Sequence, residues 1–70
     1  MERKNIESTM IRSIGFDPES SILEIEFISG AIWQYFDFPE SEWYEFENTE
    51  SQGKYFNREI LNQYTESQVG

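Results

Sequence analysis

Two glutamates at alternate positions are the first candidates for chemistry in this sequence. Glu24 and Glu26 lie in the stretch ILEIEFI, where apolar and acidic residues alternate. Residues two apart on a strand project from the same face, with their Cα atoms roughly 6.5–7 Å apart. Carboxylate pairs at such a spacing can carry acid–base chemistry on glycosidic bonds. A chain of 70 residues hardly forms a deep cleft, and alternating glutamates are typical of an exposed sheet face. We therefore expect no enzymatic activity.

The sequence also lacks the residue types that most catalytic and metal sites require. It contains neither cysteine nor histidine, which removes the common nucleophile–base pairs and the Cys/His zinc sites. The glutamates within residues 39–48 do not have the spacing of a calcium loop. A solvated acidic helix face explains them better. We predict no catalytic residue, no metal ligand and no cofactor.

A few cations and one aromatic residue form the candidate ligand-binding surface. Lys54 and Arg58 are four residues apart in a helical pattern, so they share one face, and Tyr55 lies beside them. A tyrosine next to cations can stack a base of single-stranded RNA. The sequence thus predicts ligand-binding roles for Lys54, Tyr55 and Arg58, with Arg12 as a further candidate. In the alternative interpretation, these cations only balance nearby acids such as Glu50 and Glu59.

The overall charge bears on which partner is expected. Fourteen acidic residues against five basic ones give a formal net charge of −9. Such a chain repels polyanions at long range, and non-specific nucleic-acid binding depends on Lys and Arg contacts with phosphates. We expect no DNA binding. A basic protein partner, bound through an acidic sheet face or an edge strand, is the alternative to RNA.

The start of the chain carries no targeting signal. MERKNIEST lacks the apolar stretch of a signal peptide, and no segment approaches the roughly 18 apolar residues of a membrane span. We expect a cytoplasmic protein without a membrane partner.

The elements that must position these residues follow from periodicity and turn residues. The pattern predicts strands at residues 10–17, 22–28 and 31–38, and helices at residues 39–48 and 54–64. Short turns between the strands indicate an antiparallel order. The fold class is therefore α+β, a three-stranded antiparallel β-meander followed by two short helices packed on one face. Residues 9–65 form the single domain, and residues 1–8 and 66–70 are expected to be flexible ends.

The face on which Trp33 and Tyr35 lie depends on the loop after Phe27. A two-residue turn places both rings on the solvent face. A three-residue loop with Gly30 in the left-handed conformation shifts the strand by one residue and turns both rings into the core. Burying Gln34 without a partner costs about 1–3 kcal/mol, and exposing two aromatic rings forfeits apolar burial. We favour the three-residue loop.

Several short motifs, in this order and at these spacings, resemble the KTSC domain family. They are Gly15-Phe16-Asp17, the strand Leu23–Phe27, Trp33-Gln34-Tyr35, Phe38-Pro39 and Gly53–Asn57. The family has tyrosine where this chain has Trp33. The resemblance covers about residues 8–64. The family is named for its occurrence at the C-terminus of some lysyl-tRNA synthetases and also exists as stand-alone bacterial proteins. The resemblance implies the fold, no established activity, and RNA as the suggested ligand.

Overall fold

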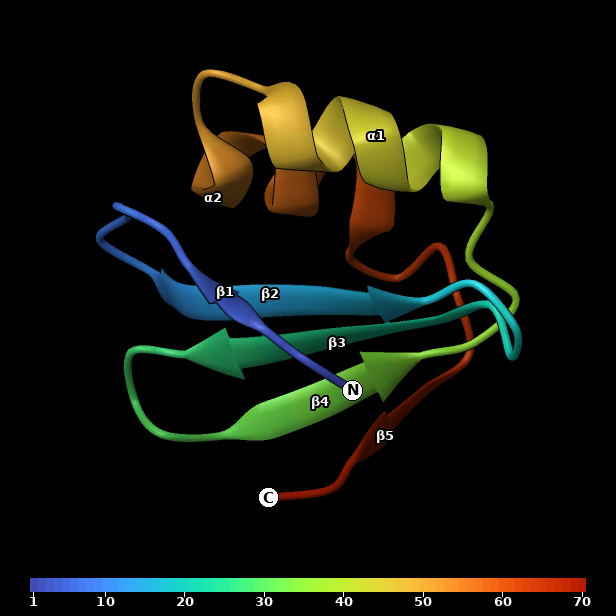
Figure 1. The fold of residues 1–70 in the computed structure, drawn as a ribbon. Helices are drawn as coiled ribbons and strands as arrows, with labels where there is room; N and C mark the ends of the chain where they lie inside the picture. Colours follow the sequence, from blue (N-terminus) through green and yellow to red (C-terminus); the bar gives the residue numbers. More distant parts are fainter.

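A computed structural model describes all residues, 1–70, and shows a five-stranded antiparallel sheet with a helical layer on one side (Figure 1). The strands are β1 (Lys4–Asn5), β2 (Ile11–Asp17), β3 (Ile22–Phe27), β4 (Ile32–Tyr35) and β5 (Glu66–Gln68). Their spatial order is β1-β2-β3-β4-β5, so each strand pairs with its neighbour in sequence. The helical residues lie between β4 and β5 in the chain. The fold is α+β, as predicted.

The loop between β3 and β4 has the predicted three-residue form. Gly30 has a φ of +97°, a conformation that glycine adopts without a Cβ clash. The Phe27 N–H donates to the Ala31 carbonyl and the Gly30 N–H donates to the Phe27 carbonyl, each at 2.9 Å. These two bonds place the bulge in the loop and set the register of β4.

The register places the aromatic residues of β4 on the core side. Tyr35 pairs with Leu23 and Trp33 pairs with Ile25. The Tyr35 side chain is buried, and Trp33 is half-buried against the core. Gln34 lies on the other face of the sheet. The rings of this strand are therefore part of the scaffold and do not form an exposed stacking surface.

The structure corrects the predicted number of strands from three to five. Lys4 of β1 pairs with Ile14, and Ser67 of β5 pairs with Gln34. These strands lie at the two edges of the sheet, within the segments that the sequence marked only as chain ends. They contain two and three residues without apolar alternation, so no periodic signal predicts them. Pairing with an edge strand satisfies backbone groups that would otherwise need water. The flexibility of the ends remains a prediction.

Two helical segments cover the sheet. Helix α1 (Glu40–Asn48) follows Pro39, as expected. Helix α2 (Gln52–Tyr55) begins at Ser51, whose hydroxyl accepts from the Lys54 N–H, and continues directly into a π-helical turn, η1 (Phe56–Ile60). None of these helices has the length and apolar character needed to cross a membrane.

The second helix is displaced relative to the predicted range of 54–64. It begins two residues earlier and ends at Ile60. The chain then turns through Asn62, which has a positive φ of 64° and cannot continue a right-handed helix. Tyr64 therefore reaches the core from a loop.

The core lies between the sheet and the helical layer, and half of its buried residues are aromatic. Phe56 makes edge-on contacts with Phe27 and Tyr35, at centroid distances of 5.4 and 5.7 Å. The buried core residues are Ile11, Ile14, Leu23, Ile25, Tyr35, Phe38, Phe46, Tyr55, Phe56 and Ile60. Because each aromatic side chain buries a large area, this composition suits a chain with few residues to bury.

Candidate binding groove

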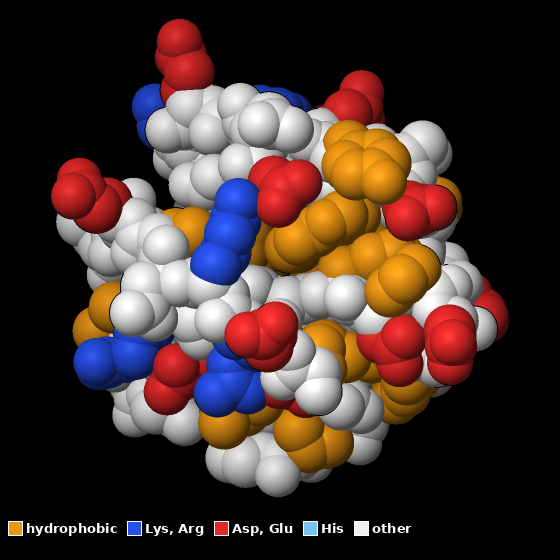
Figure 2. Space-filling model, viewed as in Figure 1, with side chains coloured by type: hydrophobic (Ala, Val, Ile, Leu, Met, Phe, Trp, Pro, Cys, Tyr) orange, Lys and Arg blue, Asp and Glu red, His pale blue; other side chains and the backbone are white.

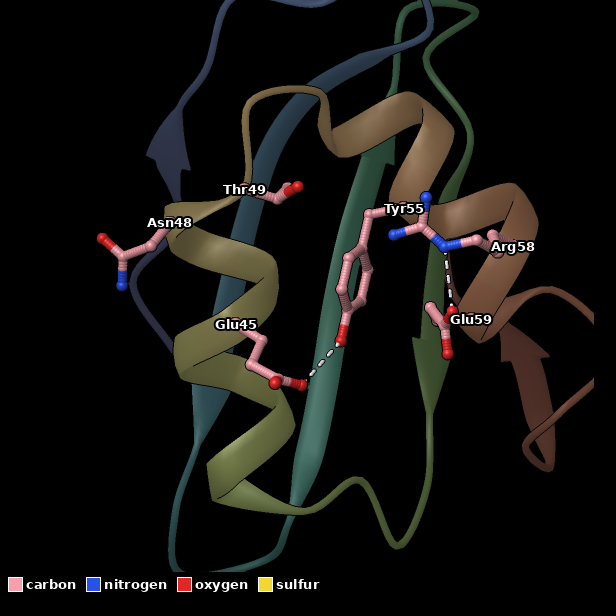
Figure 3. A pocket seen from close by; sticks show the side chains of 6 residues that line it. All are labelled: Glu45, Asn48, Thr49, Tyr55, Arg58 and Glu59. Carbon is pink, nitrogen blue, oxygen red and sulfur yellow. Dashed lines mark hydrogen bonds and ion pairs between the residues drawn. The ribbon is translucent and has the colours of Figure 1, made fainter.

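An open groove lies between α1 and the helical segment α2–η1 (Figure 3). Its volume is about 560 Å³, and its lining residues are Glu45, Asn48, Thr49, Tyr55, Arg58 and Glu59. Two of the residues predicted to bind a ligand, Tyr55 and Arg58, thus meet in one concave surface.

Tyr55 forms the floor of the groove. Its side chain is only 7% exposed, and its ring lies 5.4 Å from that of Phe46. Its hydroxyl donates to Glu42 and Glu45 of α1, at 3.3 and 3.4 Å. A ring held in this way joins the two helices and offers little free area for stacking a base.

The hydroxyl of Tyr55 belongs to a small polar cluster beneath the groove. Glu42 accepts from Tyr55 with one carboxylate oxygen and from Tyr64 with the other. Burial, with the negative charge and hydrogen bonding of Glu42, raises the pKa of both phenols above the usual value of 10.0. Both tyrosines therefore stay protonated and act as donors at neutral pH.

Arg58 is the exposed cation of the groove. Its guanidinium carbon lies 5.6 Å from the centroid of the Tyr55 ring, within the range of a cation–π contact. Its Nε donates to Glu59 at 2.9 Å, and the Arg58 side chain remains 63% exposed. This pair is one that the alternative interpretation expects, and the ligand-binding role of Arg58 stays a prediction. The pair is solvent-exposed, so its contribution to stability is small.

The helical turn that carries Arg58 and Glu59 has an unusual geometry. Residues Phe56–Ile60 form a π-helix, and the Leu61 N–H donates to the Phe56 carbonyl at 2.8 Å. Short π-helical turns occur frequently at functional sites. No sequence pattern predicts this turn, because the positions of Phe56 and Ile60 fit an ordinary α-helix equally well.

The other two candidate residues lie outside the groove. Lys54 lines a separate hollow of about 360 Å³ together with Glu7 and Glu50. Arg12 lies at the bulge of β2, and its Nη2 donates to the Ile28 carbonyl at 3.3 Å. The four residues predicted to bind a ligand therefore do not form one continuous site.

The two glutamates considered for acid–base chemistry are held in a network on the outer face of the sheet. The guanidinium of Arg3 forms an ion pair with Glu24 and lies 3.9 Å from Glu26. Ser13 Oγ accepts from Arg3 Nε at 3.0 Å and donates to Glu26 at 2.9 Å. Gln34 donates to Glu24 at 2.9 Å.

Sequence reasoning missed Arg3, because it lies in a segment predicted to be a flexible end. The one available signal was charge, since a cation near the start of the chain could pair with the glutamate face. No group of three or more carboxylates in the structure is arranged to hold a metal ion.

Comparison with known proteins gives one family. The model of the KTSC domain family matches residues 7–64. An uncharacterised protein from Stutzerimonas stutzeri is 40% identical over 58 residues, which cover 83% of this chain and 82% of that protein. A crystal structure of a KTSC domain protein from Yersinia pestis has a TM-score of 0.96 and 32% identity, and the match covers 99% of this chain and 97% of that one.

Two larger proteins contain a related region. A lysine–tRNA ligase from a Nostoc species is 33% identical over 63 residues, and one from Nostoc punctiforme is 30% identical over the same length. Each match covers 90% of this chain but only 11% of the ligase. The similarity therefore concerns a small part of those enzymes.

Proposed function

Because the chain belongs to the KTSC domain family, we propose that it is a non-enzymatic binding domain whose ligand is single-stranded RNA, contacted through the groove around Arg58. The family is not a known enzyme family. The observation that carries the proposal is the Arg58 guanidinium, 63% exposed at the groove and stacked over the Tyr55 ring. A guanidinium in this position can pair with a phosphate or stack on an unpaired base.

The relatives support RNA as the ligand class. Two proteins with a matching region are named lysine–tRNA ligases, so in those chains the domain accompanies an enzyme of tRNA. Thr49 and Asn48 add polar groups beside Arg58 in the groove, although Asn48 points away from its centre (Figure 3) and donates to the Tyr44 carbonyl.

The acidic residues of the groove limit its affinity for RNA. Glu45 and Glu59 line the same surface as Arg58, and the net charge of the chain is −9. Both features repel phosphates, so binding is expected to be weak and strongly dependent on salt.

A gel-shift titration with a labelled single-stranded RNA of about 10 nucleotides tests the proposal. We expect binding at low salt that weakens as salt rises. Arg58→Ala should weaken it and lower the slope of log Kd against log salt by about one. Glu59→Gln should strengthen it, because this change removes a competing negative charge from Arg58.

The matched control is Arg12→Ala, which removes a cation outside the groove. It should leave RNA affinity nearly unchanged. If no RNA is bound at low salt, or if Arg12→Ala and Arg58→Ala weaken binding equally, the groove is not an RNA site.

A basic protein partner is the second candidate, and the outer face of the sheet favours it. Glu24 and Glu26 lie there with Gln34 and Ser13, and this face already holds one guanidinium, that of Arg3. The surface has the charge to receive arginine from a partner.

A further inference from the structure

We infer that the outer face of the sheet is a receptor for an arginine carried on an extended peptide segment, and that the N-terminal residues occupy it as a displaceable internal ligand. The inference rests on the second candidate function above and names its partner: an arginine-bearing strand that adds to the β2 edge.

The first argument is the completeness of the arginine site. Three groups from two strands surround the Arg3 guanidinium: Ser13 Oγ at 3.0 Å, the carboxylate of Glu24, and Glu26 at 3.9 Å. The Gln34 side chain of β4 donates from Nε2 to Glu24 Oε1 at 2.9 Å and so holds that carboxylate in place. Side chains from β2 and β3 thus converge on one planar cation, an arrangement suited to arginine because its donors form a rigid fork.

The second argument is the way the backbone approaches. A Cβ added at Gly15 would lie 2.5 Å from the Glu2 carbonyl oxygen and 3.0 Å from the Arg3 side chain. Only glycine leaves room for a chain to cross the sheet at this point. The face therefore combines an edge for backbone pairing, a glycine gap and a side-chain receptor, the parts required for recognition by strand addition.

The third argument is the weak attachment of the present occupant. Strand β1 has only two residues, paired at Lys4–Ile14 and Asn5–Ser13, and both of its residues are exposed. Lys4 adds an ion pair to Glu47 of α1, with the lysine side chain 50% exposed. Figure 2 shows Lys, Arg, Asp and Glu side chains interspersed on the face that carries β1. Ile6 adds one backbone bond, to the Arg12 carbonyl at 3.1 Å, and packs against the core. Terminal segments open more easily than the domain unfolds.

The fourth argument is charge. The side chains of Glu24 and Glu26 are only 12% and 24% exposed with Arg3 in place. Once Arg3 leaves, two adjacent carboxylates lose their cation in a chain of net charge −9. An incoming arginine restores that pairing, whereas an acidic or neutral strand does not.

The test measures binding of a labelled peptide, MERKNIE, identical to residues 1–7, to the full-length chain by fluorescence anisotropy. The tethered segment competes at an effective concentration in the millimolar range, so the wild-type chain should bind weakly. Arg3→Ala should bind the peptide about tenfold more tightly or better. The same peptide with alanine in place of its arginine should not bind, and Glu24→Gln combined with Arg3→Ala should abolish the gain.

Control experiments separate this inference from the second candidate function, binding of a basic protein partner. Arg58→Ala removes an exposed cation elsewhere and should bind the peptide as the wild type does. Near-ultraviolet circular dichroism checks that Arg3→Ala remains folded. A lysine-only peptide that binds regardless of Glu24 would overturn the inference while leaving a basic partner possible at another surface. If neither MERKNIE nor the lysine-only peptide binds, both this inference and the second candidate function are overturned. A wild-type dimer in sedimentation that Arg3→Ala abolishes would also overturn it, because the occupant would then be a second copy.

Discussion

Glu42 joins separate segments of the helical layer through its carboxylate. One carboxylate of α1 accepts hydrogen bonds from Tyr55 in α2 and from Tyr64 in the following loop. The Tyr64 hydroxyl donates to Glu42 alone, whereas the Tyr55 hydroxyl also donates to Glu45. The residue thus ties three segments of the layer together and fixes the floor of the groove.

Replacement of Glu42 by alanine should destabilise the protein by about 1–3 kcal/mol, because the part-buried Tyr64 hydroxyl loses its acceptor and the Tyr55 hydroxyl keeps only Glu45. Glu42→Gln retains one acceptor oxygen and should cost less. Urea unfolding followed by tryptophan fluorescence measures both.

Glu40→Ala is the matched control on the same helix. Glu40 accepts from the exposed hydroxyl of Tyr44 at 3.3 Å, and loss of an exposed contact should change stability by less than about 0.5 kcal/mol. Equal losses for Glu40→Ala and Glu42→Ala would show that the cluster has no special role.

Single residues also show where sequence reasoning stops. The spacing of Lys54, Tyr55 and Arg58 correctly placed them on one helical segment, but it did not reveal that Tyr55 points into the core. The partners of its hydroxyl are 10 and 13 residues away in the chain. Such contacts depend on how two helices pack and leave no local pattern.

Among the elements, the register of β4 was predicted from strong local evidence. Gly30 and Gln34 together selected the register of β4, because the wrong register would have buried a lone amide. In the structure Gln34 lies opposite Glu24 and donates to it. The edge strands and the π-helical turn could not be predicted, since their residues follow no distinguishing periodicity. They exist because an already formed sheet and core provide partners for them.

Gly15 of β2 leaves room for the N-terminal segment, which crosses the sheet at this position. Gly15→Ala should detach that segment, since the added Cβ would lie 2.5 Å from the Glu2 carbonyl oxygen. Trypsin cleaves after arginine and lysine, so cleavage after Arg3 and Lys4 should accelerate. Mass spectrometry of the digest over time measures the rate.

Gly53→Ala is the control for this change. A Cβ at Gly53 would meet its nearest neighbour, Ser8 Oγ, at 3.5 Å, an ordinary contact. Its cleavage after Arg3 should match that of the wild type. If Gly15→Ala also matches the wild type, the close approach at Gly15 does not hold the segment in place.

At the scale of the molecule, the packed core has no disulfide to support it. Chains of about this size bury only about 60% of the surface that they expose when unfolded, and this one has no cysteine to form a disulfide. The aromatic core compensates. Three of its tyrosines, Tyr35, Tyr55 and Tyr64, have pKa values raised above 10.0, with burial as the largest cause.

These tyrosines make stability decrease at alkaline pH. Above the usual tyrosine pKa of about 10, the unfolded chain releases phenolic protons that the folded chain retains, so the unfolded state binds fewer protons and gains stability. We expect the contribution of these tyrosines to the free energy of unfolding to be steady below about pH 9 and to fall as the pH rises through about 11. Urea unfolding at a series of pH values measures it.

Tyr64→Phe should make that decline shallower, because one of the three phenols with a raised pKa is gone. An unchanged alkaline slope in this variant would mean that Tyr64 ionises as easily in the folded chain as in the unfolded one.

The two edge strands have a practical consequence for work with this domain. β5 places the C-terminus along one border of the sheet, whereas the N-terminal segment before β1 runs across the sheet (Figure 1). The residues that line the groove all lie between Glu45 and Glu59, away from both termini in the chain. An affinity tag or a surface-coupling group at the C-terminus therefore attaches beside β5 and keeps Arg58 accessible. The same group at the N-terminus disturbs the segment that holds Arg3. Affinities measured on a biosensor with the two orientations will therefore differ for ligands of the outer sheet face and agree for ligands of the groove.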